Sequence, residues 1–169
     1  MRRLLLLRHA KAVPLTREDD FDRVLAESGR DDARKLGEYM AHSGLTPDRA
    51  IYSGAARTRE TYEILSANWP HALETQVENA LYEATRFLIL GLLREIPASS
   101  RAPLIVGHNP GMADVANLLT GEGASTERLR LASKFPTGAL AVIAFDRPDW
   151  SELAPRTGRL ERFVTPHDL

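Results

Sequence analysis

The chain has 169 residues, of which 43% are hydrophobic and 27% charged, and it contains no cysteine. This length and balance fit a single globular domain over residues 1–169, and the absence of cysteine excludes disulfides, thiolate metal sites and cysteine nucleophiles. Because 22 basic and 23 acidic side chains nearly cancel, to a net charge of -1, we expect no general attraction to nucleic acid or to an anionic membrane.

The amino-terminal residues imitate a signal peptide but fall short of one. Only Leu4 to Leu7 separate the basic start of the chain from Arg8 and His9, whereas a signal peptide needs roughly 7 or more apolar residues. No apolar run approaches the roughly 20 residues of a membrane span. Since disulfides are also excluded, we expect a cytoplasmic protein that does not act on membranes.

Apolar periodicity predicts strands that alternate with helices along the chain. The predicted strands cover residues 3–8, 49–52, 73–77, 103–107, 139–145 and 159–164, and the predicted helices cover 31–42, 56–67, 85–96 and 111–119. Residues 12–28 and 121–134 are expected to be polar loops. The alternation predicts an α/β fold, a three-layer α/β/α sandwich with a mostly parallel, doubly wound sheet and an antiparallel edge strand. Residues 159–164 are expected at an edge of that sheet.

Two of the predicted buried strands end in a histidine. Leu4 to Leu7 lead into Arg8-His9, and residues 103–107 lead into His108-Asn109-Pro110. Ligands of open α/β sheets bind just outside the carboxyl ends of the strands, so both imidazoles are expected beside a ligand. The guanidinium of Arg8 suits phosphate, and the helix start after His108 offers free backbone N–H groups to an anion. From the local sequence alone, a solvated Arg-His pair and an incidental histidine remain open.

Two more charged residues lie near strand ends. Arg57 falls in the first turn of the helix predicted over residues 56–67, where the positive end of the helix dipole disfavours a cation. This placement suggests a compensating anion, although a surface pair with Glu60 is the alternative. Glu83 comes just before the helix predicted over residues 85–96, where a solvated acid is the alternative.

Together these residues supply the groups that phosphoryl transfer requires. Fixed cations stabilise the phosphoryl oxygens, a neutral imidazole can be the in-line nucleophile, and a carboxylate can protonate a leaving group. The chain has no His-x-x-x-His pattern and no cysteine. We therefore expect no metal and no cofactor, with the positive charge coming from protein side chains.

The motifs resemble those of the histidine phosphatase superfamily, also called the phosphoglycerate mutase-like family, in order along nearly the whole chain. Arg8-His9-Ala10 resembles its Arg-His-Gly signature, and residues 53–61 (SGAARTRET) resemble its Ser-x-x-x-Arg-x-x-x-Thr segment. Residues 106–111 (VGHNPG) and 134–139 (KFPTGA) resemble the small branch typified by the phosphohistidine phosphatase SixA. Ala10 replaces the usual glycine, at little cost if its φ is negative. Lys11 stands where an acidic residue is frequent, which can alter the preference for substrate charge.

The resemblance implies a role for each of these residues. His9 would be the nucleophile that becomes phosphorylated, and Arg8, Arg57 and His108 would hold the phosphoryl oxygens. Glu83 lies where larger members carry their general acid, a carboxylate that some SixA-like proteins lack.

The sequence thus predicts a cofactor-independent phosphatase that hydrolyses phosphohistidine on a protein through phospho-His9. A phosphatase of a small phosphomonoester, which Glu83 would favour, and a catalytically idle module that binds phosphorylated ligands remain as alternatives. The expected partner is a phosphorylated protein, and the chain is expected to be a monomer. Residues 12–28 and 121–134 are too short for a lid domain, so we expect an open site that suits a protein side chain better than a small ester.

Overall fold

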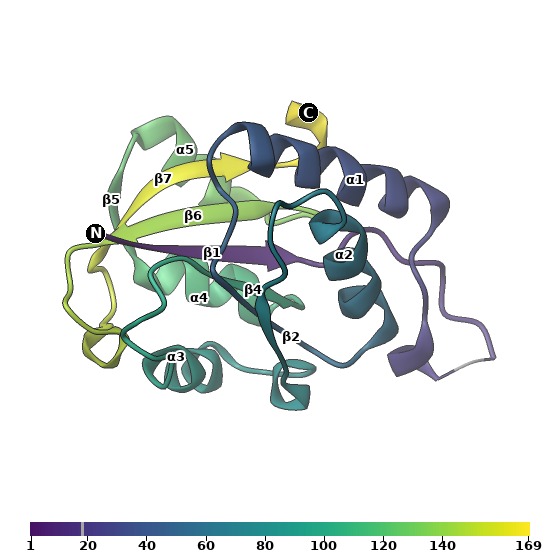
Figure 1. Cartoon of the computed structure of the whole chain (residues 1–169), viewed down its shortest axis with the longest axis horizontal. Coiled ribbons are helices and arrows are strands. Elements are labelled where there is room, and N and C mark those ends of the chain that lie inside the picture. Colours follow the sequence, from purple (N-terminus) through teal and green to yellow (C-terminus); the bar gives the residue numbers. More distant parts are fainter. Residues whose placement is uncertain (18) are drawn as a thin grey trace.

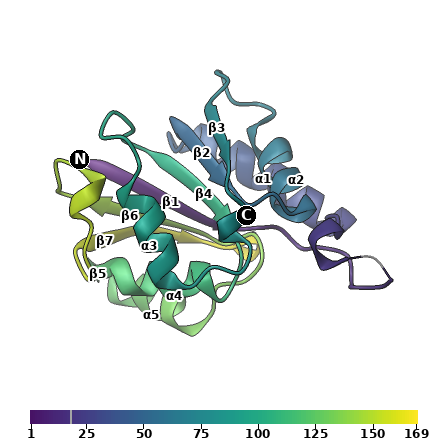
Figure 2. The ribbon, with the colours of Figure 1, turned by 90° about the horizontal axis from the view of Figure 1, so that it is seen from below.

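The structure, a computed structural model, describes residues 1–17 and 19–169 and places one seven-stranded sheet between two layers of helices (Figures 1 and 2). The strands are β1 (Arg2–Arg8), β2 (Arg49–Tyr52), β3 (Glu74–Val77), β4 (Pro103–Gly107), β5 (Thr120–Gly123), β6 (Leu140–Phe145) and β7 (Gly158–Val164). The α-helices are α1 (Glu27–His42), α2 (Ala56–Ser66), α3 (Arg86–Arg94), α4 (Gly111–Leu119) and α5 (Ser125–Ser133). This arrangement confirms the predicted three-layer α/β class. Glu18, within the predicted loop 12–28, lies outside the described residues.

The strand order is β3-β2-β4-β1-β6-β7-β5, with β1 at the centre. Strand β1 pairs in parallel with β4 and antiparallel with β6, so that Leu5 lies opposite both Leu104 and Val142. The pairs β2–β3, β2–β4 and β5–β7 are parallel, and β6–β7 is antiparallel. The carboxyl ends of β1, β2 and β4 therefore meet at one end of the sheet, as parallel strands require.

The unbroken leucine run of β1 is explained by burial on both faces. Leu4 and Leu6 belong to the core beneath α3, α4 and α5, whereas Leu5 and Leu7 belong to the core beneath α1 and α2. Figure 2 shows these two helix layers on opposite sides of the sheet. A strand covered on both faces has no polar face, so its sequence shows no alternation.

The carboxyl-terminal third differs from the expectation in its strand order. The antiparallel strand β6 lies inside the sheet, and residues 158–164 form β7, which is flanked on both sides rather than lying at the edge. The edge strand on this side of the sheet is β5, in residues expected to be a loop, and β3 is the edge strand on the other side. Both edge strands pair in parallel with their neighbours, so the antiparallel strands β6 and β7 are inside the sheet and not at its edge as predicted. The four residues of β5 include two glycines and show no alternating apolar pattern. Backbone hydrogen bonds to β7, and not buried side chains, hold this short strand in the sheet.

Three helices also depart from the sequence prediction. Helix α1 begins at Glu27, inside the expected loop 12–28 and before the predicted start at residue 31. Helix α5 occupies part of the expected loop 121–134, and only Leu131 of it is buried, so it carries little apolar periodicity. Helix α3 buries Ile89, Leu90 and Leu93, while Leu88, expected on its apolar face, is 42% exposed. Among the described residues, no helix is both long and apolar enough to cross a bilayer.

Candidate active site

Parallel pairing of β1 with β4 brings the two strand-end histidines together. Arg8 lies opposite Gly107 in the register, and the His9 backbone N–H donates to the Gly107 carbonyl at 3.1 Å. The His9 and His108 rings consequently lie with their centroids 5.2 Å apart, and each residue is only 7% exposed. Neither histidine is a solvated residue at a strand end.

The backbone holds the His9 ring in one orientation. Its Nδ1 lies 2.7 Å from the carbonyl oxygen of Ala10, which can only accept, so Nδ1 carries the proton and Nε2 keeps its lone pair. Burial, together with the positive charge of the neighbouring groups, lowers the pKa of His9 to about 3. The ring is therefore neutral at pH 7, with a free nitrogen available for nucleophilic attack.

Ala10 takes the place of the family glycine without strain. Among the described residues other than glycine, only Arg156 has a positive φ, so the backbone at Ala10 suits an L-residue. The Ala10 N–H donates to Thr61 Oγ1 at 3.0 Å, which ties the end of β1 to helix α2. Thr61 is the last residue of the Ser-x-x-x-Arg-x-x-x-Thr segment, and its position is explained by this contact.

His108 is oriented by Ser53, the first residue of the same segment. Its Nε2 lies 2.8 Å from Ser53 Oγ, which also accepts the backbone N–H of Ala55 at 3.2 Å. Ser53 Oγ also lies 3.3 Å from the Thr58 hydroxyl, so both of its lone pairs have a donor and we assign its own proton to His108 Nε2. This places the ring proton of His108 on Nδ1. Burial and the nearby Arg57 lower the pKa of His108 to about 4, so this ring is also neutral at pH 7.

The two arginines are each held by their Nη atoms. Arg8 donates from Nη1 to the carbonyl of Phe135 at 3.1 Å. Arg57, in the first turn of α2, donates from Nη1 to the backbone oxygen of Asp20 at 2.8 Å and from Nη2 to its carboxylate at 3.1 Å. The alternative surface pair with Glu60 does not form, because the Glu60 carboxylate accepts from Arg30 and from the Leu25 backbone instead.

Three buried polar atoms at this site have no partner. They are Nε of Arg8, Nε of Arg57 and Nδ1 of His108, and among the described residues the one other such side-chain atom is Nε of Arg49. A buried donor without an acceptor costs on the order of 1–3 kcal/mol, so three of them beside His9 indicate a site built to bind the acceptor atoms of a ligand. Two cations and a neutral imidazole suit an anion with several oxygens.

Residues 134–138 make hydrogen bonds to both histidine motifs. The carbonyl of Phe135 accepts from both Arg8 Nη1 and Asn109 Nδ2. The N–H of Gly138 donates to the carbonyls of Arg8 and His9, and its φ of +75° requires glycine. This explains why the segment accompanies the histidine motifs in the sequence.

Asp20 and Tyr82 are site residues that the sequence reasoning missed. The Tyr82 hydroxyl donates to the Asp20 carboxylate, and its ring lies edge-on to His108 with centroids 5.3 Å apart. Its ring centroid also lies 5.7 Å from the Arg57 guanidinium carbon. The available signals were the acidic cluster at residues 19–22 and the position of Tyr82 directly before Glu83.

Glu83 itself lies in an exposed turn between β3 and α3. Within residues 1–17 and 19–169, the structure gives its side chain no hydrogen bond or ion pair. The side chain of Lys11 is exposed, and its carbonyl accepts the N–H of Ala26 at the start of α1.

The segment expected to be spare covers one side of the site. Residues 20–22 form a short 3-10 helix whose Asp20 contacts Arg57 and Tyr82, and Phe21 packs edge-on against Tyr82 at 5.0 Å. These residues therefore form one side of the site.

The acidic sequence Asp20-Phe21-Asp22 is an Asp-x-Asp pattern, but its carboxylates do not converge on a metal position. Within the described part of the chain, no group of three His, Asp or Glu side chains could hold a metal ion. The positive charge at the site comes from Arg8 and Arg57.

Comparisons with known proteins show which family this chain is similar to. A sequence model of the histidine phosphatase superfamily (branch 1) matches residues 4–102. The structure of a candidate phosphohistidine phosphatase SixA from Agrobacterium tumefaciens is 30% identical, with 98% of each chain covered and a TM-score of 0.83. A second candidate phosphohistidine phosphatase SixA, from Nakamurella multipartitia, is 27% identical, with 98% of this chain and 96% of that chain covered and a TM-score of 0.84. An uncharacterized protein of Mycobacterium leprae is 29% identical over 95% of this chain and 99% of its own length.

Proposed function

This chain belongs to the histidine phosphatase superfamily, and we propose that it hydrolyses phosphohistidine on a protein through a covalent phospho-His9 intermediate, without a cofactor. The observation that carries the proposal is the set of three buried, unpartnered donors around the neutral ring of His9. The likeness to two candidate SixA proteins supports the choice of phosphohistidine as the substrate.

The donors would bind the phosphoryl oxygens. Each guanidinium has five N–H donors in a planar fork, so Asp20 can hold Arg57 through its Nη atoms while Nε donates to the substrate. Arg8, anchored at Phe135, presents its Nε in the same way, and His108 adds its Nδ1–H. Donors fixed before the reaction stabilise the charge that develops in the transition state.

In the first step, the lone pair of His9 Nε2 attacks phosphorus. The Nε2–P bond forms while the P–N bond to the substrate imidazole breaks, and that electron pair returns to the substrate nitrogen. Nδ1 of His9 keeps its proton, which it donates in a hydrogen bond to the Ala10 carbonyl oxygen throughout, so no proton needs to leave the nucleophile.

In the second step, water attacks the phosphorus of phospho-His9. The Nε2–P bond breaks, its electrons return to Nε2, and dihydrogen phosphate leaves with both protons of the water. Since Nδ1 is still protonated, phospho-His9 is a cationic imidazolium adduct, which makes neutral His9 a good leaving group. The resting tautomer is restored without a metal-bound hydroxide.

The choice between phosphohistidine and a phosphomonoester depends on proton supply to the leaving group. An alkoxide needs a proton as it leaves, whereas an imidazole that already carries a proton does not. Glu83, the residue that the family resemblance implies as acid, makes no polar contact with the described residues of the site. Because the proposed imidazole leaving group is already protonated, Glu83→Gln is expected to change phosphohistidine hydrolysis by less than about threefold.

The test is to trap the intermediate. Wild-type protein is mixed with a protein bearing 32P-phosphohistidine and quenched in alkali within milliseconds to seconds. Label is expected on the wild type and on His71→Ala, an exposed-histidine control, but not on His9→Ala. Binding without label or phosphate release would support the idle module, and turnover of small esters alone would support the metabolite phosphatase.

A further inference from the structure

The Asp20 carboxylate accepts hydrogen bonds from three side chains next to the proposed phosphoryl-binding groups. Its Oδ2 accepts from Arg57 Nη2 and from the Tyr82 hydroxyl, and its Oδ1 accepts from Arg23 Nε at 2.8 Å. The side chain is 36% exposed, whereas that of Arg57 is 7% exposed. Asp20 therefore lies between the buried guanidinium and solvent.

These bonds leave Asp20 ionised and with one acceptor position unused. The hydrogen bond from Tyr82, with those from Arg23 and Arg57, lowers the pKa of Asp20 to about 2. An ionised carboxylate offers about four lone-pair positions, and the three side-chain donors occupy three of them. The remaining position is on Oδ1 and belongs to a partly exposed group. A carboxylate in this state cannot donate a proton, but it can accept one more hydrogen bond.

The leaving group must occupy the solvent side of the phosphoryl group. In-line displacement places it opposite His9 Nε2, and His9 is 7% exposed, so the substrate protein can approach only from outside. Asp20 borders that side, through its contacts with Arg57 and with Tyr82, whose ring touches His108. The carboxylate is thus beside the route that the leaving group takes.

Resting on the proposed function, we propose that Asp20 determines substrate specificity by accepting a hydrogen bond, at Oδ1, from the distal N–H of the phosphohistidine ring. A phosphorylated imidazole that is protonated on its other nitrogen leaves as neutral imidazole when the P–N bond breaks, because the bonding electrons return to the released nitrogen. An unprotonated one would have to leave as an imidazolate. The fixed anion favours the protonated substrate, and the proton stays on the imidazole throughout.

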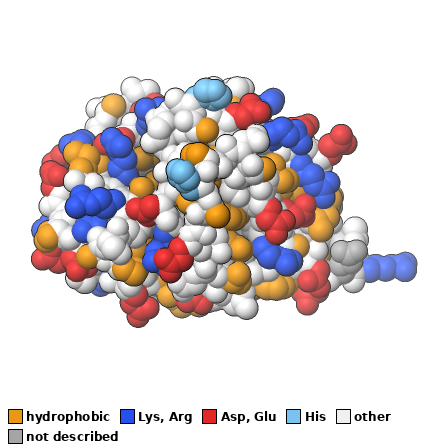
Figure 3. Space-filling model, viewed as in Figure 1, with side chains coloured by type: hydrophobic (Ala, Val, Ile, Leu, Met, Phe, Trp, Pro, Cys, Tyr) orange, Lys and Arg blue, Asp and Glu red, His pale blue; other side chains and the backbone are white. Residues whose placement is uncertain are grey.

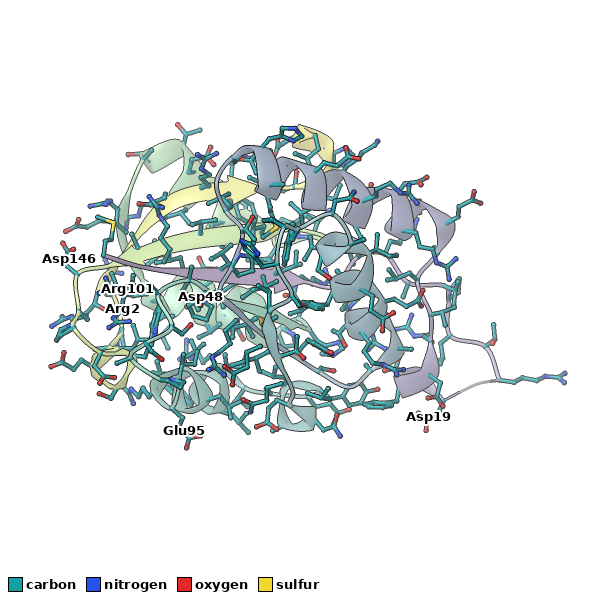
Figure 4. The ribbon with its side chains drawn as sticks, viewed as in Figure 1. Arg2, Asp19, Asp48, Glu95, Arg101 and Asp146 are labelled. Atoms are coloured by element: carbon teal, nitrogen blue, oxygen red, sulfur yellow. The ribbon has the colours of Figure 1, made fainter. Side chains whose placement is uncertain are left out.

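The experiment compares two substrates across matched variants. The first substrate is a phosphohistidine peptide, and the second is 4-nitrophenyl phosphate, whose leaving group has no N–H to donate. The variants are Asp20→Asn and, as a control in the same short helix, Asp22→Asn, since Asp22 is exposed. Asp19, labelled in Figure 4, is unsuitable as the control because its side chain caps this helix.

Asp20→Asn is expected to lower kcat/KM for the phosphohistidine peptide by about 10- to 100-fold, the size of one lost charge-assisted hydrogen bond. For 4-nitrophenyl phosphate the loss of kcat/KM should be several-fold smaller, because this ester reports only the effect of Asp20→Asn on the placement of Arg57. A thermal melt checks that the variant is folded. Asp22→Asn should leave both values unchanged.

Equal losses on both substrates would mean that Asp20 only positions Arg57, and would overturn the specificity role, as would the absence of any loss. Wild-type protein that hydrolyses the ester but not the phosphohistidine peptide would overturn the proposed function itself. The first two results leave that function intact, so the two failures are distinguishable.

Discussion

The two ends of strand β1 each carry an arginine, Arg2 buried and Arg8 half-buried, and the hydrogen-bond donors of the two are satisfied differently. At the amino-terminal end, Arg2 donates to the carbonyls of Ala98, Ser100, Arg147 and Pro148 through Nε and both Nη atoms. At the carboxyl-terminal end, Arg8 makes one hydrogen bond, to Phe135, and its Nε has no partner. Figure 4 labels Arg2 near the start of β1, and Arg8 is the last residue of that strand.

The difference shows how a structural arginine can be told from a ligand-binding one. Arg2 and Arg57 are both 6% exposed, so burial alone does not separate them. Arg2 has its donors matched by backbone carbonyls and its guanidinium 5.7 Å from the Trp150 ring, and thereby ties two loops to β1. Arg8 and Arg57 each have a buried Nε–H donor without a hydrogen-bond partner. Unpartnered donors at one end, and matched donors at the other, indicate which end binds an anion.

Surface charge does not distinguish the ligand-binding end of the sheet from the other end. On the face seen in Figure 3, basic and acidic side chains are interspersed. The site is marked by the hydrogen-bond state of a few buried groups.

The largest expected effect is at the nucleophile. His9→Ala should lower kcat by more than about 10^4-fold, because the covalent route is lost, while the thermal unfolding midpoint changes little. The measurement is steady-state phosphate release together with a thermal melt. Residual turnover near the wild-type value would show that the donors at this end serve another nucleophile.

The next effect separates binding from structure at Arg57. Arg57→Ala should cost about 3 kcal/mol or more of transition-state stabilisation, the scale of one preorganised charge donor. Arg57→Lys should recover only part of it, because the planar fork is lost. Inorganic phosphate should raise the melting temperature of the wild type but not of Arg57→Ala. A Lys variant with wild-type kcat/KM would contradict a specific role for the fork.

The opposite result is expected at the other end of β1. Arg2→Ala removes the partner of four carbonyls and should cost about 3 kcal/mol of unfolding free energy, measured in urea. The kcat/KM of the folded fraction should stay within about twofold. A large loss of kcat/KM with unchanged stability would remove the contrast between the two ends.

Acidification should lower the free energy of unfolding, because His9 is held neutral in the folded protein. The pKa of His9 in the folded protein is lowered to about 3, below its ordinary 6.5, so the unfolded chain binds the proton first as pH falls. This stability is fully present above pH 6.5 and is lost progressively down to pH 3. At pH 5 the share of this loss that is due to His9 is about 2 kcal/mol, since each pH unit is worth 1.36 kcal/mol. His108, whose pKa is lowered to about 4, adds a further loss of the same sign.

Urea unfolding at pH 7.5 and pH 5 measures this difference, and His9→Gln should reduce the acid-dependent loss by about 2 kcal/mol. Asp20 adds almost no slope between pH 7.5 and pH 5, because its carboxyl is ionised there both in the folded protein, where its pKa is about 2, and in the unfolded chain, where its pKa is the ordinary 3.8. An identical loss in wild type and variant would show that His9 is not held neutral by burial.

The smallest expected effect is that of metal removal. With arginines supplying the positive charge, we expect activity to survive EDTA within experimental error. A large loss that Mg²⁺ or Zn²⁺ restores would mean that the unpartnered donors are not sufficient to hold the phosphoryl group.

The sequence determined the fold class and the pairing of functional motifs with strand ends. A run such as Leu4 to Leu7 can be buried only in a sheet covered on both faces, and the residue after it must then lie at the sheet end. That local rule predicted that Arg8, His9 and His108 lie at one end of the sheet. The first-turn position of Arg57 predicted a compensating anion beside it, and the anion that it contacts in the structure is the Asp20 carboxylate.

Tertiary structure decided the strand order in the carboxyl-terminal third and the partners of the arginines. Strand β5 is specified by pairing with β7 and not by its own apolar pattern, so periodicity could not reveal it. Asp20 reaches Arg57 across 37 positions, and Tyr82 reaches Asp20 across 62. Contacts between residues so distant in sequence leave no periodic trace, because they depend on how separate elements come together.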